Sequence, residues 1–305
     1  MISIIIPTFN KSSRLRLCLY FLSKINIDFN VEVIIVNDGS TDNTDRVVQD
    51  QIKGFNNKYN IKIIKTPNKG RACARNIGAQ NAQYEIFLFL DDDIILNEDI
   101  LETHRMLHAN SSRIVRGKIL HLPYMKSFED PCVLPSECNT SLKELYKNMV
   151  LDLNKGADSC YRIFQKYSRE TKFEKLIRKA VLDNNYFKWL CFTGANTSIE
   201  KKLFYHIGEF DCKFKKTWGC EDIEFGYRIC LNNKAEFIYD ASYAAYHLDH
   251  FRANYFKEHQ INMDYFIEKY PEDEKLQYLS MYFKNLITEN ELLNFKSTSN
   301  NYKER

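Results

Sequence analysis

The chain has 305 residues, 44% of them hydrophobic and 27% charged, and this balance excludes a disordered or fibrous protein. Its net charge of +3 is too small to indicate a nucleic-acid partner. Its apolar runs are shorter than the roughly 18 residues of a membrane span, so we expect a cytoplasmic protein. The nine cysteines include no CxxC pair, which predicts reduced thiols rather than a disulfide framework or a zinc site.

Strands and helices alternate over the first 120 residues. Apolar runs predict strands at 3–6, 31–36, 61–64, 86–90 and, more weakly, 114–115. Helical segments between the first four strands are expected at 13–25, 40–52 and 70–82. Because these strands are continuously apolar rather than alternating, they favour a parallel sheet that helices cover on both faces.

Polar residues follow three of these strands directly. The three segments are Pro7 to Asn10, Asn37 to Ser40, and Asp91 to Asp93. In open parallel sheets, ligands bind at the carboxyl ends of the strands. The sequence therefore predicts a binding site where these three segments meet.

The rest of the chain is expected to be largely helical. A helical insertion is predicted at about 121–190, with an amphipathic helix over 142–153, and residues 141–190 hold eleven Lys or Arg against six Asp or Glu. A solvated basic face explains this charge better than an acceptor-binding or membrane-surface element. Residues 255–293 also have a helical pattern, broken at Pro271, and a polar tail follows.

The acidic run after the fourth strand has two interpretations. Asp91 and Asp93 are two residues apart, so a continuing strand would point both carboxylates to one face. Two carboxylates there could hold Mg²⁺ or Mn²⁺ through oxygen ligands. An acidic turn that caps the next helix would have the same sequence, and for this pattern alone it is the more common outcome.

A second acidic segment, "TWGCEDIEFGYR", spans residues 217–228. Trp218 and Gly219 suggest an aromatic wall beside a close backbone approach, and the acids after them open a predicted helix. One of these carboxylates could act as a general base on an acceptor hydroxyl, although acids in a first helical turn are also ordinary caps. His247 and His250 could complete a metal site or be structural histidines.

The order of the motifs resembles that of a known family. These motifs are "IIIPTFN", "VIIVNDGSTDNT", "NKGRACARNIG", "FLFLDDD", "FTGANTSI", "IGEFDCKF" and "WGCEDIEFGYR". Over about residues 2 to 250 they resemble a family 2 glycosyltransferase of the GT-A fold. The last two are similar to a branch shared with polypeptide N-acetylgalactosaminyltransferases, galactosyltransferases and chondroitin polymerases.

The resemblance implies an α/β fold with a Rossmann-like, mostly parallel central sheet flanked by helices. It implies a catalytic domain over residues 1–250, which includes the insertion, and a helical C-terminal extension over 251–305. Asp222 would be the catalytic base beside Glu221. The metal ligands would be Asp93, Asp91 and His247. The nucleotide would lie against Pro7, Thr8, Asn10, Asp38, Arg71, Asp91 and Asp92. The sugar and acceptor would be framed by Trp218, Gly194, Ala195 and Asn196.

The implied reaction is transfer of a hexosyl or N-acetylhexosaminyl group in bacterial-type glycan or glycoconjugate synthesis. The donor would be a nucleotide-sugar, UDP-linked by preference, with Mn²⁺ or Mg²⁺, and inversion is favoured over retention. The acceptor could be a saccharide, a lipid-linked carrier or a peptide, with the protein at most peripheral on the inner face of the membrane. Two alternatives are a catalytically idle nucleotide-sugar-binding scaffold and a nucleotidyltransferase, although "PTFNKSSR" lacks the glycines that the latter usually carries there.

Overall fold

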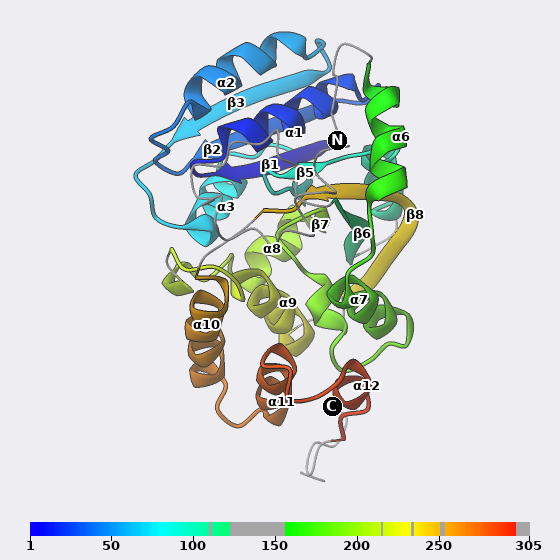
Figure 1. Ribbon diagram of the computed structural model, residues 1–305. Coiled ribbons are helices and arrows are strands. Elements are labelled where there is room, and N and C mark those ends of the chain that lie inside the picture. Colours follow the sequence, from blue (N-terminus) through cyan, green and yellow to red (C-terminus); the bar gives the residue numbers. More distant parts are fainter. Residues whose placement is uncertain (110–111, 123–155, 215, 233–234, 251–253, 297–305) are drawn as a thin grey trace, which may run out of the picture.

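The computed structural model describes residues 1–109, 112–122, 156–214, 216–232, 235–250 and 254–296 (Figure 1). Their core is an eight-stranded sheet of order β3-β2-β1-β4-β7-β6-β8-β5. Its strands are β1 (Ile2–Thr8), β2 (Val31–Asn37), β3 (Tyr59–Lys65), β4 (Ile86–Phe89), β5 (Ile94–Ile95), β6 (Arg113–Leu122), β7 (Thr197–Glu200) and β8 (Glu236–Leu248).

Helices surround this sheet. The α-helices are α1 (Ser12–Lys24), α2 (Thr44–Gln51), α3 (Arg71–Gln80), α4 (Ile100–Leu107), α6 (Ala157–Tyr167), α7 (Lys172–Leu182), α8 (Lys201–Ile207), α9 (Glu221–Asn232), α10 (Tyr255–Lys269), α11 (Glu274–Phe283) and α12 (Glu289–Leu293). Short 3-10 turns are η1 (Ile52–Gly54), η3 (Lys188–Cys191) and η4 (Cys212–Phe214). Among the described residues, no helix combines the length and apolar character needed to cross a bilayer.

The N-terminal half of the sheet has the predicted parallel form. Strands β3, β2, β1 and β4 are parallel neighbours, and every residue of β1 and β2 is buried. Ile4 packs in one apolar cluster with Leu15 of α1, whereas Ile5 packs in another with Ala79 of α3. Successive residues of β1 therefore face helices on opposite sides, which explains the continuous apolar runs in the sequence.

The other half of the sheet is mixed. β7 pairs antiparallel with β4 and β6, β6 pairs parallel with β8, and β5 pairs antiparallel with β8. The expected α/β fold with a mostly parallel central sheet is confirmed, since four of the seven pairings between these strands are parallel. The weak run at 114–115 is the start of the ten-residue β6, because pairing with β8 continues to Leu122 where the sequence pattern is no longer apolar.

The C-terminal helices pack onto the same core as the rest of the chain. Phe266 of α10 lies 6.0 Å from the ring of Trp189, and Leu276 and Leu279 of α11 belong to the same cluster. The predicted break at Pro271 is confirmed, since α10 ends at Lys269 and α11 begins at Glu274. The helix predicted over 142–153 and most of the polar tail lie outside the described residues.

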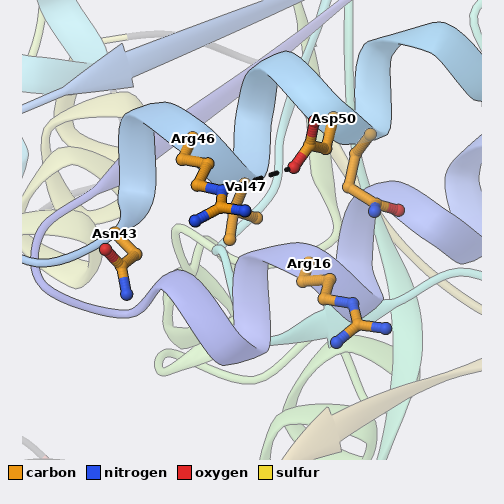
Figure 2. Close-up of a pocket in the computed structure, with 6 residues that line it drawn as sticks. Arg16, Asn43, Arg46, Val47 and Asp50 are labelled. Carbon is orange, nitrogen blue, oxygen red and sulfur yellow. Dashed lines mark ion pairs between the residues drawn. The ribbon is translucent and has the colours of Figure 1, made fainter.

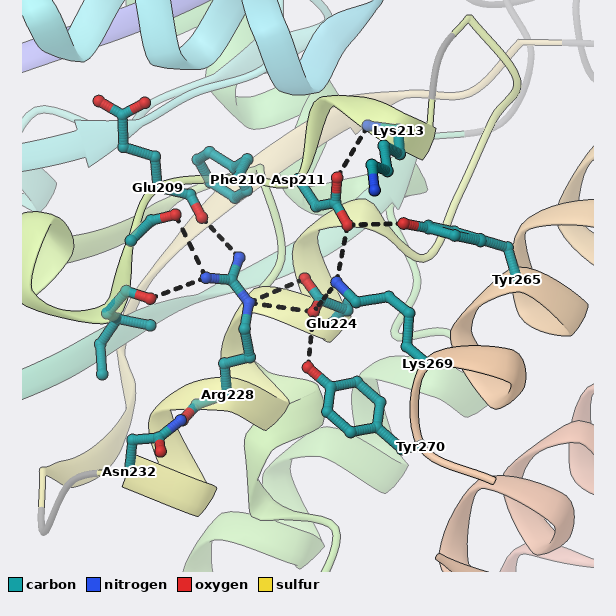
Figure 3. Close-up of polar contacts among 12 residues, drawn as sticks. Glu209, Phe210, Asp211, Lys213, Glu224, Arg228, Asn232, Tyr265, Lys269 and Tyr270 are labelled. Carbon is teal, nitrogen blue, oxygen red and sulfur yellow. Dashed lines mark hydrogen bonds and ion pairs between the residues drawn. The ribbon is translucent and has the colours of Figure 1, made fainter. Parts of the chain in front are cut away.

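Buried charge also ties α9 to α10. Glu224 is fully buried and accepts bonds from Arg228 Nε at 3.0 Å, Lys269 Nζ at 2.6 Å and Tyr270 OH at 3.0 Å. Figure 3 shows these groups converging on Glu224, with Lys269 also contacting Asp211 at 2.7 Å. The third acid of the 217–228 segment is thus a structural anchor for the extension.

The cysteines differ from the sequence prediction. Cys73 of α3 and Cys212 of η4 form a disulfide, with their Cα atoms 5.2 Å apart. Because 139 residues separate the two cysteines, only the fold brings them together, and cysteine count and spacing could not indicate the pair. Five other described cysteines are free.

Candidate active site

The three polar strand ends meet as predicted. The parallel register places Thr8 beside Asn37, and the N–H of Asp38 donates to the Thr8 carbonyl at 2.9 Å. Lys11, just beyond Asn10, reaches the acidic turn, where its ammonium group lies 2.6 Å from Asp93 Oδ2 and 3.3 Å from Asp92 Oδ1.

The acidic run does not continue as a strand. β4 ends at Phe89, and residues 91–93 form a turn, so strand alternation does not set where their side chains point. Asp91 contacts Arg75, with 2.8 Å between Asp91 Oδ1 and Arg75 Nη2, whereas Asp92 and Asp93 contact Lys11. Asp91 therefore lies apart from the group that could bind a metal.

Asp93 forms that group with two histidines. β5 pairs Ile94 with His247, and the N–H of Leu248 donates to the Asp93 carbonyl at 2.9 Å. Asp93 Oδ1 lies 3.6 Å from His247 Nε2, and Asp93 Oδ2 lies 3.2 Å from His250 Nε2. One ligand atom from each of the three residues lies within 4.8 Å of the others. His250, which the sequence pattern left open, is thus a neighbour of Asp93.

The donor set fits a divalent cation. Asp93 Oδ1 is buried without a hydrogen-bond partner among the described residues, and a carboxylate with two imidazoles suits Mn²⁺ and similar ions. His247 Nδ1 lies 2.7 Å from Asp249 Oδ1, the kind of contact that orients a ligating imidazole. His121 also contacts Asp249, at 2.6 Å, and so helps to fix the carboxylate that orients His247.

The pKa values in this cluster are set by burial and by neighbouring charges, which act in opposite directions on the two aspartates. Burial alone would raise the pKa of Asp93, but Lys11 and the two imidazoles outweigh it and hold that pKa well below its usual range. Burial raises the pKa of Asp92 to about 6, against the pull of Lys11. Burial and the charge of Lys11 lower the pKa of His250 to about 4, which keeps its imidazole neutral, as metal ligation requires.

Arg75 joins this acidic turn to the second acidic segment. Its side chain is 1% exposed, and its Nη1 lies 2.9 Å from Glu221 Oε1 while its Nη2 holds Asp91. A Cβ on Gly194 would lie 1.9 Å from Arg75 Nη2, so only glycine leaves room for the guanidinium. Sequence reasoning missed Arg75. Its one signal is a charged residue inside the small-residue helix pattern "RACARNIGA".

Asp222 and Glu221 begin α9 in different environments. Asp222 Oδ2 accepts the N–H of Gly194 at 2.9 Å, and its Oδ1 accepts that of Ile223 at 2.8 Å. Burial and the adjacent charge of Glu221 raise the pKa of Asp222 to about 6, against Arg75. Burial would also raise the pKa of Glu221, but Arg71 and Arg75 outweigh it and lower that pKa. Of these two carboxyl groups, Asp222 has the pKa closer to neutrality, which is the property that a general base needs.

Asn196 differs from its predicted place. It is fully buried, its Oδ1 lies 3.0 Å from His104 Nε2, and its Nδ2 donates to the Lys118 carbonyl. It therefore fixes the turn from within the core and does not frame an open sugar site. Ala195 is partly buried against an apolar cluster.

The remaining predicted residues lie around this centre. Asp38 accepts the N–H groups of Lys69 and Gly70, each at 2.8 Å, and so shapes the loop that leads to Arg71. Arg71 Nε lies 3.7 Å from Glu221 Oε1. Pro7 belongs to buried β1, and Asn10 Oδ1 accepts the N–H of Thr41 at 2.7 Å. Trp218 packs on Tyr255, with 4.5 Å between the ring centroids.

A separate hollow lies between α1 and α2 (Figure 2). It contains none of the predicted site residues. Its lining consists of Arg16, Asn43, Arg46, Val47, Asp50 and Gln51.

Comparisons with known proteins show which sequences and folds this chain is similar to. Residues 3–122 match the model of glycosyl transferase family 2. The chain is 29% identical to chondroitin synthase from Escherichia coli over 235 residues, which are 75% of this chain and 32% of that protein. It thus spans about a third of that relative's length.

Two solved structures share the fold. A mannosyltransferase from Pyrobaculum calidifontis, in complex with GDP-Man and Mn²⁺, superposes with a TM-score of 0.62 at 15% identity and covers 96% of this chain and 71% of its own. TarS from S. aureus, in complex with UDP-GlcNAc, gives 0.52 at 17% identity, with 93% and 71% covered. The chain therefore shares the GT-A fold of these glycosyltransferase structures, and its residues 3–122 match the family 2 model.

Proposed function

We propose that the protein is a metal-dependent transferase that moves a sugar from a nucleotide-sugar donor to an acceptor hydroxyl, with inversion at the anomeric carbon. The observation that carries this proposal is the pairing of two acidic centres with different properties. The Asp93 centre suits a cation, while Asp222 is a carboxylate with a pKa of about 6. Buried Arg75 contacts an acid beside each of them.

The donor would bind at the Asp93 centre. Asp93, His247 and His250 would hold Mn²⁺ or Mg²⁺, which when bound stabilises the negative charge of the departing diphosphate. Asp38 directly follows β2 and Arg71 begins α3, and both would contact the nucleotide. A UDP-sugar is our preferred donor, supported by the UDP-GlcNAc complex of TarS, although the mannosyltransferase binds GDP-Man.

Asp222 would be the base. Each of its carboxylate oxygens accepts one backbone N–H, which leaves acceptor capacity on both for a proton. As the acceptor oxygen bonds to the anomeric carbon, the bond from that carbon to the diphosphate breaks and the hydroxyl proton passes to Asp222. Glu221 stays in its ion pairs, where its charge helps to raise the pKa of Asp222. Trp218 and Gly194 would adjoin the sugar and acceptor.

Replacing the base tests the chemistry directly. Asp222→Asn should lower kcat by about 10²–10⁴-fold, because the acceptor proton loses its destination. Donor affinity, measured by calorimetry with Mn²⁺, should stay the same. The matched control is Asp50→Asn, at an exposed aspartate of α2. Normal turnover in Asp222→Asn would refute the assignment.

The pH profile tests the same group by its pKa. Only the ionised form of Asp222 can accept a proton, and its pKa is raised to about 6. We expect kcat to level off above about pH 7 and to fall about tenfold per pH unit below 6. The acid limb should vanish from the residual rate of Asp222→Asn. If it persists there, another group, such as Asp92, controls the profile.

The metal centre can be tested without turnover. Asp93→Asn and His250→Ala should each weaken Mn²⁺ binding by more than about 10-fold. Loss of a residue that only contacts a metal ligand already costs about 10–100-fold in affinity. Binding is measured by electron paramagnetic resonance titration of free Mn²⁺. His206→Ala, at an exposed position of α8, is the control. Unchanged affinity in both site variants would place the metal elsewhere.

Arg75 gives a prediction for stability. Arg75→Met leaves Glu221 buried without its closest cation, so the free energy of unfolding should fall by about 3–5 kcal/mol. Arg105→Met removes an arginine from a half-exposed pair with Glu102 and should cost less than about 1 kcal/mol. Denaturant unfolding monitored by circular dichroism compares the two. If both variants lost the same free energy of unfolding, the buried ion pair would contribute no more to stability than the half-exposed one.

A further inference from the structure

A cavity lies at the far end of α9 from Asp222. It has a volume of about 520 Å³, within the range of about 300–1,000 Å³ that is usual for ligand sites. It is lined by Asn184, Asn185, Tyr186, Lys188, Trp189, Tyr227, Cys230, Leu231, Ala235, Phe237 and Lys275. These residues come from η3 and the segment before it, from α9, from the start of β8 and the residue before it, and from α11.

The lining combines flat rings with hydrogen-bonding groups. Trp189 and Tyr227 are packed edge to face, 5.2 Å apart, while Tyr186 at the rim is 66% exposed. The Nε1 donor of Trp189 is buried and has no partner among the described residues. Because that atom is closed to solvent, it does not reach the cavity space, and the groups that could bond a ligand there are those of Asn184, Asn185 and Lys188.

The charge of the lining is positive. Among the described residues that line the cavity there are two lysines and no acidic side chain. Lys275 is paired with Asp273 at 3.1 Å, whereas Lys188 Nζ donates to the neutral amide oxygen of Asn184 at 2.8 Å. Burial raises the pKa of the Cys230 thiol to about 11, and the positive charges of the two lysines oppose that rise.

The cavity is distinct from the transfer centre. Asp222 lies in the first turn of α9, whereas Cys230 and Leu231 lie in its last turn. Eight residues of helix separate Asp222 from Cys230, which is about 12 Å along the axis. Ile223 and Phe225 of the same helix are buried between them. A ligand in the cavity therefore could not touch Asp222 with the same sugar ring.

We propose that this cavity is a second saccharide site, which holds an acidic sugar unit of the acceptor or product glycan. Sugar rings pack their apolar faces on exposed aromatic side chains such as Tyr186, their hydroxyls bond to amides, and a carboxylate pairs with lysine. The inference rests on the proposed function only for its choice of a saccharide. A glycan held at both places would gain effective concentration at Asp222.

The two tryptophans of the chain provide a direct readout. Trp218→Phe leaves Trp189, inside the cavity, as the one indole in the protein. In this background, without donor or metal, tryptophan fluorescence is titrated with a hyaluronan hexasaccharide and with its carboxyl-reduced, neutral form. We expect a saturable change with the acidic probe and binding at least about tenfold weaker with the neutral one, the value of one charge-assisted hydrogen bond.

Variants test whether the fluorescence response arises from binding in the cavity. Tyr186→Ala with Lys188→Gln should abolish the response, whereas Tyr243→Ala with Lys202→Gln, at exposed positions on β8 and α8, should leave it unchanged. Asp222→Asn should also leave it unchanged, which separates this inference from the proposed function. A folded protein with no response to the acidic probe, equal affinity for the neutral probe, or displacement by inorganic phosphate alone at matched charge would each overturn the proposal.

Discussion

The guanidinium of Arg75 is the point on which the rest of the site depends. It is buried, and it contacts Asp91 in the turn after β4 and Glu221 at the start of α9. Two acidic segments 130 residues apart in the sequence (91 and 221) would otherwise repel each other at close range. Gly194 leaves room for the guanidinium because it has no side chain, and its N–H donates a hydrogen bond to Asp222. The backbone at residue 194 and the pairing of the buried charges therefore depend on each other.

This arrangement separates the acids into distinct electrostatic states. Asp93 and Glu221 are kept ionised by nearby cations, while Asp92 and Asp222 have pKa values raised to about 6. Such pairs of carboxyl groups with diverging pKa values mark places where one acid binds or orients and its neighbour exchanges protons. In the proposed mechanism, the cation and the base are therefore assigned to carboxyl groups whose pKa values differ.

Much of this could be predicted from the sequence, and the reasons for the remainder are physical. Continuous apolar runs located β1, β2 and β4, and the polar residues after them located the site, because parallel strands put their carboxyl ends on one edge. The antiparallel half of the sheet was not predicted, since β7 and β6 are fixed by their partners rather than by their own patterns. Arg75 and the partners of Asn196 were missed for a related reason. A side chain's role in a buried network depends on residues about a hundred positions away, and local spacing carries no record of them.

The anchor at Glu224 has a consequence for how this protein can be divided. The resemblance in the sequence extends only to about residue 250, yet Lys269 and Tyr270 beyond that point contact the buried carboxylate of Glu224 on α9, the helix that carries Asp222 in its first turn. Shortening the chain at the motif boundary would strip that helix of a counter-ion inside the core. Modular exchange of the C-terminal helices between relatives would therefore have to carry the matching acid along with them, so the two parts are constrained to change in step.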